Sequence, residues 1–187
     1  ENSKKHRSEL FTIITVANLM PVKNLNLLLD IASVLKDFEF KIIGEGTEKL
    51  KLQKRIENYG LKNVELCGYK SPKQIKRHYE SADCFLLTSL AEGTPTSVLE
   101  AMASGLPIIS SNAGGLNQII KDNVNGFIIK NYCKTNYVEA IYKLKNDQKL
   151  SEFIKGNNII ESKNFKWEKV AEKINNLIEN CYYDRLG

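Results

Sequence analysis

Short apolar runs alternate with amphipathic stretches along most of the chain. Residues 11–18 (FTIITVAN) form an apolar, β-branched run, which is typical of a buried strand. Residues 24–36 carry apolar side chains at positions 25, 28, 29, 32 and 35, and this spacing predicts a helix. Further strand-like runs lie in the ranges 38–44, 63–68, 83–89, 106–111 and 125–130. Further helical stretches lie between them, in the ranges 47–60, 71–82, 94–105 and 114–121.

This order of elements predicts the fold class. Six strands separated by short helices indicate an α/β, Rossmann-like fold: a six-stranded parallel sheet with helices on both faces. Ser71 and Pro72 are expected to open one helix as its N-cap and first residue, and Gly60 and Gly105 to end two others. Beyond residue 134 only helices are expected, the last over residues 167–186.

The domain organisation follows from the same pattern. The chain shows no internal repeat and no low-complexity linker. We therefore expect one domain over residues 11–187, preceded by a polar segment at 1–10 that is a frayed tail or the stub of a linker.

Composition narrows the class of protein. The 187 residues are 42% hydrophobic and 26% charged, as in an ordinary globular domain. No apolar run reaches the roughly 18 residues of a membrane span, and the start lacks a signal-peptide pattern. The 4 cysteines form no C-x-x-C pair, so buried free thiols and a cytoplasmic location are expected.

The net charge of +5 comes mainly from scattered lysines. A Lys-rich scatter indicates a solvated surface rather than a nucleic-acid interface, which favours clustered arginine. The excess could still hold a phosphorylated ligand or bring the protein close to anionic lipid headgroups, as a peripheral membrane contact.

Glycine and polar residues gather where each predicted strand ends. They form the segments 18–23 (NLMPVK), 44–47 (GEGT), 68–70 (GYK), 88–94 (TSLAEGT) and 110–115 (SSNAGG). In an open α/β sheet, ligands bind outside the carboxyl ends of the strands. The sequence therefore places the candidate site at this edge.

The segment 92–105 (EGTPTSVLEAMASG) carries the most suggestive chemistry. Thr94 can cap the helix with Pro95 at its first position, so that the free N–H groups of Thr96 and Ser97 suit a phosphate. Glu92 precedes the cap and Glu100 lies inside the helix on an inward face, where a carboxylate could accept two vicinal sugar hydroxyls. The alternative is that Glu92 only favours the helix dipole and Glu100 is a surface residue.

This segment resembles the E-x7-E signature of retaining, GT-B-fold nucleotide-sugar glycosyltransferases of family four, the glycosyl transferases group 1. The resemblance covers roughly residues 11–180 and includes the stretches 16–32, 40–53, 64–89 and 165–174. It implies the carboxyl-terminal, donor-binding half of a two-domain enzyme, whose amino-terminal half carries the acceptor site. It also implies transfer without a metal or other cofactor, from a UDP- or GDP-linked sugar to a glycan or lipid-linked acceptor in cell-surface polysaccharide or glycoconjugate synthesis.

The resemblance also implies roles for individual residues. Lys23 would bind the donor diphosphate and Glu92 would lie near the sugar hydroxyls, and these two are the candidate catalytic residues. The donor-binding candidates are Asn18, Tyr69, Lys70, Gly93, Thr94, Thr96, Ser97 and Glu100. Taken alone, Lys23 could be an ordinary solvated lysine and Tyr69 an ordinary turn aromatic.

Two positions depart from the family pattern. Asn18 stands where the family usually has a diphosphate-binding Arg, and Gln118 stands where an acidic residue is common. Losing the Arg removes a charge-assisted contact, unless a base such as Lys70 compensates. A non-catalytic nucleotide-sugar binding module therefore remains an alternative, as does an epimerase or phosphorylase on the same fold.

Other chemistries find little support in the sequence. No two aspartates are spaced as in a D-x-D metal motif, and GEGTEK lacks the glycine and lysine pattern of a dinucleotide or P-loop fingerprint. There is no G-x-S-x-G segment, and His6 and His78 lie away from the glycine-rich edge. A metal site is therefore not expected.

Overall fold

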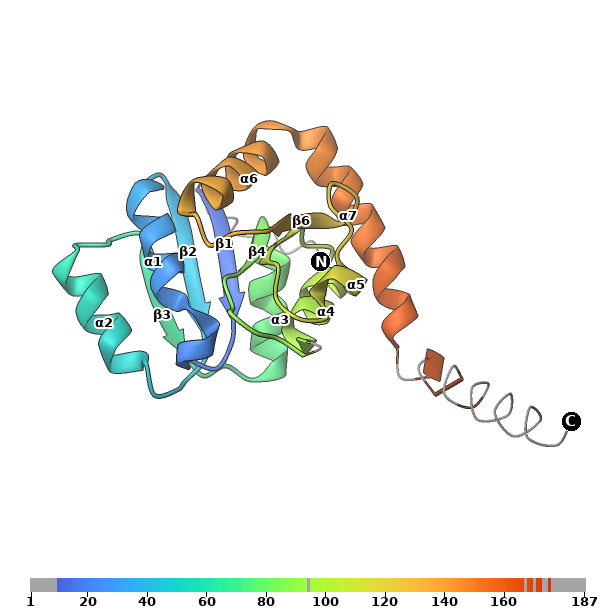
Figure 1. The fold of residues 1–187 in the computed structure, drawn as a ribbon, viewed down its shortest axis with the longest axis horizontal. Helices are drawn as coiled ribbons and strands as arrows, with labels where there is room; N and C mark the ends of the chain where they lie inside the picture. Colours follow the sequence, from blue (N-terminus) through green and yellow to red (C-terminus); the bar gives the residue numbers. More distant parts are fainter. Residues whose placement is uncertain (1–9, 94, 167, 170, 173–174, 176–187) are drawn as a thin grey trace, which may run out of the picture.

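The protein is built around one parallel sheet (Figure 1). The computed structural model describes residues 10–93, 95–166, 168, 169, 171, 172 and 175. Its 6 strands lie in the order β3-β2-β1-β4-β5-β6, and every neighbouring pair is parallel. They are β1 (Phe11–Val16), β2 (Phe38–Ile43), β3 (Val64–Gly68), β4 (Cys84–Leu87), β5 (Ile108–Ser111) and β6 (Gly126–Ile129). The predicted six-stranded, Rossmann-like sheet is confirmed.

Helices cover both faces of this sheet (Figure 1). One face packs against α1 (Leu25–Val34), α2 (Lys49–Asn58) and α6 (Lys134–Asn146). The other packs against α3 (Pro72–Ser81), α4 (Thr96–Ala103) and α5 (Leu116–Ile119). The long helix α7 (Gln148–Ser162) packs against α4 and α6, and two short 3-10 turns are η1 (Pro21–Lys23) and η2 (Lys163–Phe165).

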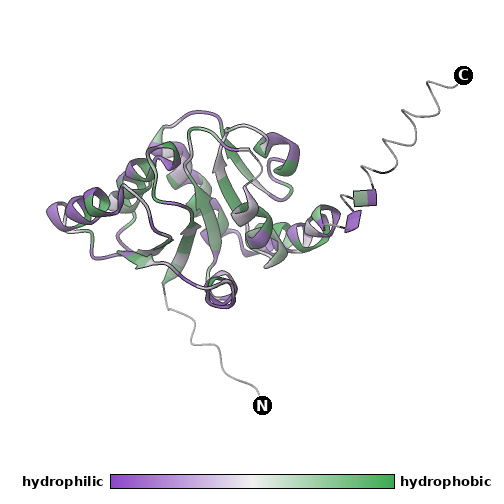
Figure 2. Cartoon of the chain, turned by 90° about the horizontal axis from the view of Figure 1, so that it is seen from below, coloured by the Kyte–Doolittle hydropathy of each residue, from purple (hydrophilic) through white to green (hydrophobic). Residues whose placement is uncertain are grey.

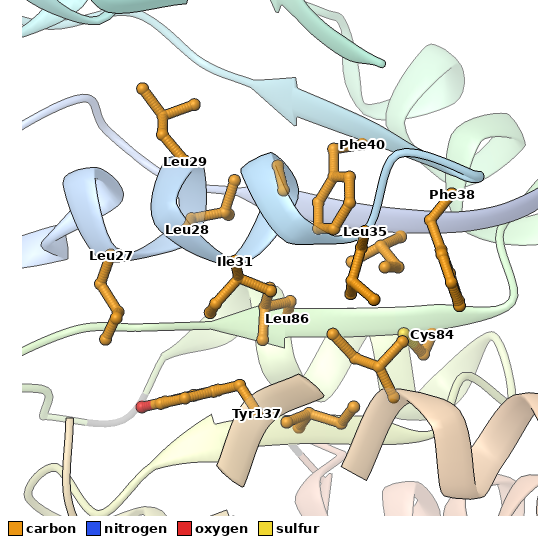
Figure 3. Packing of buried hydrophobic residues seen from close by; sticks show 14 of the residues in the cluster. Leu27, Leu28, Leu29, Ile31, Leu35, Phe38, Phe40, Cys84, Leu86 and Tyr137 are labelled. Atoms are coloured by element: carbon orange, nitrogen blue, oxygen red, sulfur yellow. The ribbon is translucent and has the colours of Figure 1, made fainter. Parts of the chain in front are cut away.

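The larger of two hydrophobic clusters lies under α1 and α6. Figure 3 shows Leu28 and Ile31 of α1, and Leu35 directly after it, packed with Leu86 of β4 and Tyr137 of α6. The helical spacing predicted for residues 24–36 is confirmed, because the residues at 25, 28, 29, 32 and 35 are all buried. Figure 2 shows the strands as the most hydrophobic part of the chain, as expected of a sheet covered on both faces.

Strand β2 departs from this rule. Phe38 and Phe40 are buried under the α1 face, whereas Glu39 and Lys41, which alternate with them, are only half-buried on the other face. A strand buried on both sides reads as a continuous apolar run, so this alternation indicates that one face of the β2 edge is open.

Helix ends follow the predicted local signals with one correction. Gly60 and Gly105 adopt φ of 59° and 77°, as left-handed residues that end α2 and α4. The N–H of Ser71 donates to Gln74 Oε1 over 2.9 Å in a capping box, followed by Pro72. Pro95, predicted at the first helical position, is instead the N-cap of α4, because its carbonyl accepts from the N–H of Val98 at 3.0 Å.

Some expectations fall outside the described residues. They are the tail at 1–9, the capping role of Thr94 and most of the last helix. The expectation of buried thiols holds for Cys84, but Cys133 is exposed and Cys67 is half-buried.

Candidate functional site

A cleft of about 500 Å³ opens at the carboxyl ends of β1 and β4. The chain leaves β1 toward β2 and β3 on one side, and returns through β4 to β5 and β6 on the other. Such a reversal of strand order separates the loops on either side of it and leaves a crevice for a ligand. The lining includes the predicted residues Asn18, Lys23, Tyr69, Lys70, Glu92, Thr96, Ser97 and Glu100.

Of the other two predicted residues, Thr94 lies outside the described part of the chain, and Gly93 is not among the lining residues. Gly93 is exposed, and a Cβ on Gly115 would lie 3.2 Å from its carbonyl oxygen. Gly93 therefore supports the chain between Glu92 and α4 and is not one of the residues that line the cleft.

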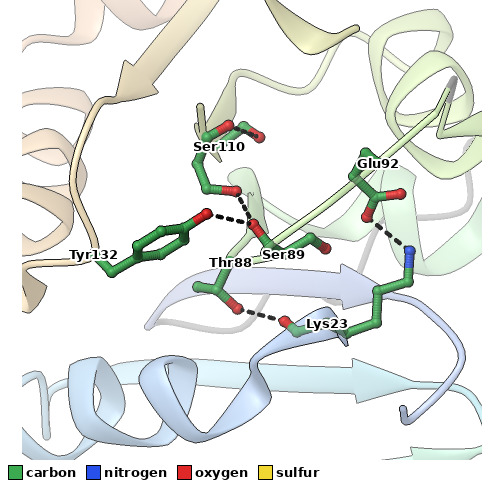
Figure 4. A network of polar contacts seen from close by, with 7 residues as sticks. Lys23, Thr88, Ser89, Glu92, Ser110 and Tyr132 are labelled. Carbon is green, nitrogen blue, oxygen red and sulfur yellow. Dashed lines mark hydrogen bonds and ion pairs between the residues drawn. The ribbon is translucent and has the colours of Figure 1, made fainter. Parts of the chain in front are cut away.

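The backbone around Lys23 is fixed from β4. Thr88, which is fully buried, donates from Oγ1 to the carbonyl oxygens of Lys23 at 3.0 Å and Asn24 at 3.1 Å. The N–H of Leu90 donates to the carbonyl of Val22 at 2.8 Å. These bonds, of which Figure 4 shows the one from Thr88 to Lys23, hold η1 against the segment after β4, so the position of Lys23 does not depend on its side chain alone.

The two candidate catalytic residues form an ion pair. Lys23 Nζ lies 2.7 Å from Glu92 Oε1, and their side chains are 20% and 6% exposed (Figure 4). A buried carboxylate needs a partner, because its desolvation is costly when it is left alone. The sequence predicted both residues at the edge but did not predict their contact.

Glycines after β5 and β2 allow the loops to approach closely. A Cβ on Gly114, which has φ of 56°, would lie 1.8 Å from the carbonyl oxygen of Glu92. A Cβ on Gly44 would lie 1.9 Å from the carbonyl oxygen of Ala17. A side chain at either position would therefore displace a cleft-lining loop. The glycine clusters GEG and AGG were visible in the sequence, but their contacts were not.

Ser89 and Ser111 tie β4 to β5 behind Glu92. Ser111 Oγ donates to the carbonyl oxygen of Ser89 at 2.6 Å, and both residues are fully buried. Tyr132 OH reaches the same carbonyl at 3.5 Å (Figure 4). These contacts brace the start of the segment that carries Glu92, and sequence reasoning had not singled out any of the three residues.

Glu100 also lines the cleft, and it is exposed, whereas the sequence predicted an inward helix face. Its carboxylate projects from the second turn of α4, and Oε2 accepts a hydrogen bond from Tyr79 OH at 3.3 Å. Tyr79 also donates toward the carbonyl of Ser97 at 3.2 Å.

Tyr79, the hydrogen-bond partner of Glu100, was missed by sequence reasoning. It is only 2% exposed, in α3, and it packs against Phe85. Burial first, and the charge of Glu100 second, raise the pKa of the Tyr79 phenol, so the hydroxyl stays protonated and acts as a donor. In the sequence it looked like an ordinary core aromatic within a helical pattern.

The amino terminus of α4 completes the cleft. Thr96 and Ser97 are the first two residues of this 8-residue helix and line the cleft. The first N–H groups of a helix have no intrahelical acceptor and carry the positive end of its dipole. Together with Lys23 they form a positive region that suits an anion such as a phosphate.

The loops after β1 and β3 also contribute residues to the cleft lining. Asn18 is exposed and lines the cleft, as do Tyr69, which is 75% exposed, and Lys70. Lys70 thus lines the same cleft as Asn18. A lysine that replaces the diphosphate contact of the family's usual Arg at position 18 must lie in this cleft. Gln118, the other departure, is exposed in α5 and is not among the cleft-lining residues.

Comparisons with known proteins identify the family of this chain. The family model "Glycosyl transferases group 1" matches residues 1–161. An uncharacterized glycosyltransferase of Methanocaldococcus jannaschii is 32% identical over 168 residues, which cover 88% of this chain and 46% of the relative. A poly(ribitol-phosphate) alpha-N-acetylglucosaminyltransferase of Staphylococcus aureus is 31% identical over 188 residues, which cover 96% of this chain and 37% of the relative.

A solved structure extends the likeness to three dimensions. A TarM variant of S. aureus, in complex with fondaparinux, alpha-GlcNAc-glycerol and UDP, matches with a TM-score of 0.81 and 29% identity. The match covers 95% of this chain and 37% of that chain. The protein therefore belongs to the glycosyl transferases group 1 family and has the α/β fold of its GT-B members. It spans less than half the length of each of these relatives.

Within the described part of the chain, no three His, Cys, Asp or Glu residues come together as a set that could hold a metal ion. No helix in it has the length and apolar character needed to cross a membrane.

Proposed function

We propose that this chain is the donor-binding domain of a retaining, metal-independent glycosyltransferase. The whole enzyme would move a sugar from a UDP- or GDP-linked donor to a glycan or lipid-linked acceptor in cell-surface polysaccharide or glycoconjugate synthesis. The observation that carries this proposal is the cleft at the strand reversal, which combines Lys23, a helix amino terminus and the carboxylates of Glu92 and Glu100.

Each part of the cleft suits one part of a nucleoside diphosphate sugar. Lys23 and the N–H groups of Thr96 and Ser97 would bind the diphosphate and stabilise the charge that develops on it as the glycosidic bond breaks. Glu100 would accept the two ribose hydroxyls, and Glu92 would face the transferred sugar. Tyr69 and Lys70, on the loop after β3, would flank the nucleoside.

The same arrangement supports transfer without a metal ion. A metal in such an enzyme would neutralise the leaving diphosphate, and in this cleft Lys23 and the dipole of α4 would take that role. The UDP in the TarM complex supports a nucleoside diphosphate as the ligand of this type of domain. The name of the S. aureus relative, a poly(ribitol-phosphate) alpha-N-acetylglucosaminyltransferase, supports transfer of a sugar to a polymeric acceptor.

The acceptor site would lie in another part of the enzyme. Residues 11–187 would form the donor domain after a tail or linker at 1–10, and an amino-terminal domain would carry the acceptor. The short span relative to the known relatives supports this division. The enzyme would work in the cytoplasm, at the inner membrane face when its acceptor is lipid-linked, and without nucleic acid.

Asn18 favours a second candidate function, a non-catalytic nucleotide-sugar binding module. It lies in the cleft as an exposed, uncharged side chain where the family usually has an arginine. One neutral amide donates more weakly to a diphosphate than a bidentate guanidinium does. Such a module would bind the donor without supporting transfer in any context.

Calorimetry of the chain against UDP, GDP and their hexose and N-acetylhexosamine derivatives tests donor binding. We expect one nucleotide series to bind with the same affinity in excess EDTA as in Mg²⁺. Lys23→Gln should weaken this binding, whereas the charge-matched control Lys36→Gln, at an exposed residue outside the cleft, should not. Binding of no nucleoside diphosphate, or binding only with Mg²⁺, would contradict the proposal.

Transfer assays separate the remaining alternatives. The chain alone should release no nucleoside diphosphate in the presence of acceptors, whereas the whole protein should do so as the acceptor is glycosylated. Transfer by these 187 residues alone would overturn the assignment of the acceptor site to another domain. Donor binding with no release by the whole protein would favour the binding module, and release that requires inorganic phosphate would favour a phosphorylase.

A further inference from the structure

The open face of β2 and β3 forms a second hollow, separate from the donor cleft. Strands β2 and β3 pair with Lys41 opposite Glu65, on the edge of the sheet away from β4. Helix α3 packs over β1, so it leaves this edge of its own face partly uncovered. Between the edge and the flank of α3 lies a hollow of about 310 Å³.

Side chains from three segments line this hollow. Helix α3 contributes Gln74, Arg77, His78 and Ser81, which share one helix face because they lie three or four residues apart. Lys41 enters from β2, and Lys70 enters from the loop after β3. We call this set the α3 hollow.

Positive charge dominates the α3 hollow. Within the described part of the chain, neither Lys70 nor Arg77 takes part in an ion pair, so their charges are not neutralised locally. Lys41 lies 3.4 Å from Glu39. Glu65, opposite Lys41 on β3, also acts on His78, and the lining itself contains the three cations Lys41, Lys70 and Arg77 and no carboxylate.

His78 responds to this charge. Its imidazole is half-buried in the hollow, and its pKa is lowered first by burial and then by the charges of Lys41 and Lys70, while Glu65 acts in the opposite direction. A positive potential disfavours the charged form of an imidazole. An anion bound beside it would raise its pKa, which makes His78 a reporter of occupancy.

We propose that the α3 hollow binds a phosphate group, as a monoester or diester, of a ligand other than the sugar donor. Arg77 supplies a planar pair of donors, Lys41 and Lys70 supply charge, and His78 supplies a ring N–H. Gln74 uses its side-chain oxygen in the capping box with Ser71, which leaves its amide NH2 available as a donor. Ser81 is not counted among the donors, because its hydroxyl donates to the carbonyl of His78 at 3.0 Å.

The hollow and the donor cleft share one residue, Lys70. Lys41, Arg77 and His78 line only the hollow, and Lys23 and Glu100 line the donor cleft but not the hollow. The two sites can therefore be separated by substitution, and the proposal holds whether or not the donor cleft binds a nucleotide sugar.

The test follows the imidazole of His78 by NMR as pH is varied, in the intact chain, with and without inorganic phosphate. Ionic strength is held constant with sodium chloride, because salt alone screens Lys41 and Lys70. We expect phosphate to raise the pKa of His78 saturably, by about half a unit or more, since an opposite charge nearby favours the charged imidazole.

Substitutions assign the effect to the hollow. Arg77→Gln and Lys41→Gln should each at least halve the phosphate-induced shift, although Lys41→Gln itself raises the starting pKa of His78. Lys23→Gln, in the donor cleft, should leave the shift unchanged. The proposal is overturned if phosphate does not move the pKa of His78, or if the shift persists in an Arg77→Gln, Lys41→Gln double variant with a wild-type unfolding temperature.

Two further arms identify the source of the phosphate group. One uses sn-glycerol 3-phosphate, and the other uses vesicles of phosphatidylglycerol against vesicles of phosphatidylcholine. A shift with glycerol phosphate supports a soluble phosphorylated ligand, whereas co-sedimentation with phosphatidylglycerol that Arg77→Gln abolishes supports a lipid headgroup. If neither arm depends on Arg77, the hollow is not a phosphate site.

Discussion

The two ends of the donor cleft hold their glutamates in different ways. At the Lys23 end, which comprises Lys23, Glu92 and Asn18, the carboxylate of Glu92 is almost fully buried and paired with a cation. At the Glu100 end, which comprises Glu100 and Tyr79, the carboxylate is exposed and accepts one bond from a neutral hydroxyl. One charge is already neutralised before a ligand arrives, and the other is not.

This difference indicates which end must rearrange when a nucleotide sugar binds. A diphosphate that binds Lys23 competes with Glu92 for the same ammonium group, and it also meets the negative charge of Glu92. A pair of ribose hydroxyls at Glu100 needs no protein contact to break, because Tyr79 already orients one carboxylate oxygen and leaves the other free. The Glu100 end is preorganised for its ligand, whereas the ion pair at the Lys23 end must break before Lys23 can bind a diphosphate.

We expect the largest change in affinity from a substitution that removes the carboxylate of the Glu100 end. Glu100→Ala should weaken binding of the nucleotide sugar by about 1.5–3 kcal/mol, or roughly ten- to a hundred-and-fifty-fold, because it removes hydrogen bonds to a charged group. Calorimetry of the chain with the nucleotide sugar measures the loss. The same variant should bind inorganic phosphate as the wild type does, since phosphate has no vicinal hydroxyls. Unchanged donor affinity in Glu100→Ala would remove the ribose assignment.

At Glu92, by contrast, we expect a substitution to increase the affinity for the diphosphate. Glu92→Gln should tighten binding of the nucleoside diphosphate by about 1–1.5 kcal/mol, or roughly five- to tenfold, because Lys23 no longer has a competing carboxylate. Titration calorimetry with the free nucleoside diphosphate measures it. The whole enzyme carrying Glu92→Gln should nevertheless transfer sugar more slowly, because its contact with the sugar is altered.

A double variant checks the cause of that gain. In a Lys23→Gln background, Glu92→Gln should change affinity less than it does alone, since the competition between the carboxylate and the ligand for Lys23 is gone. If Glu92→Gln instead weakens diphosphate binding in both backgrounds, the ion pair is not the arrangement that the ligand displaces.

Local signals explain why so much of the fold could be predicted. The apolar run of β1, the capping residues Ser71 and Pro72 and the left-handed glycines Gly60 and Gly105 each determine structure within a few residues of themselves. The parallel sheet followed from their order along the chain. The error at Pro95 is one residue in size, because its fixed φ suits either position at a helix start.

The site was predicted in position but not in its contacts. Lys23 and Glu92 could be assigned to one edge because the carboxyl ends of parallel strands meet there, but they are 69 residues apart and no local pattern encodes their pairing. Tyr79 was missed for a similar reason. Its place in a helical pattern predicts burial, whereas its bond to Glu100 depends on how α3 and α4 pack together.

A smaller gain is expected from adding charge to the Lys23 end. Asn18→Arg should tighten binding of the nucleoside diphosphate by about 1 kcal/mol, roughly fivefold, through one partly screened contact. The nucleoside without phosphate should bind as before. Comparing the two ligands at low and high salt measures the effect, because only the phosphate contact is screened. A flat response in diphosphate affinity and in its salt dependence would show that residue 18 does not face the phosphates.

The smallest expected effect tests the preorganisation of the Glu100 end itself. Tyr79→Phe keeps the aromatic packing on Phe85 but removes the hydroxyl that bonds to Glu100 and reaches Ser97. The carboxylate would then sample more rotamers, so binding of the nucleotide sugar should weaken by about 0.5–1 kcal/mol, or roughly two- to fivefold. In a Glu100→Ala background the same substitution should cost almost nothing in affinity, whereas a purely structural role would cost the same in both. Equal losses in the two backgrounds, measured by calorimetry, would therefore show that Tyr79 supports the fold and does not position Glu100.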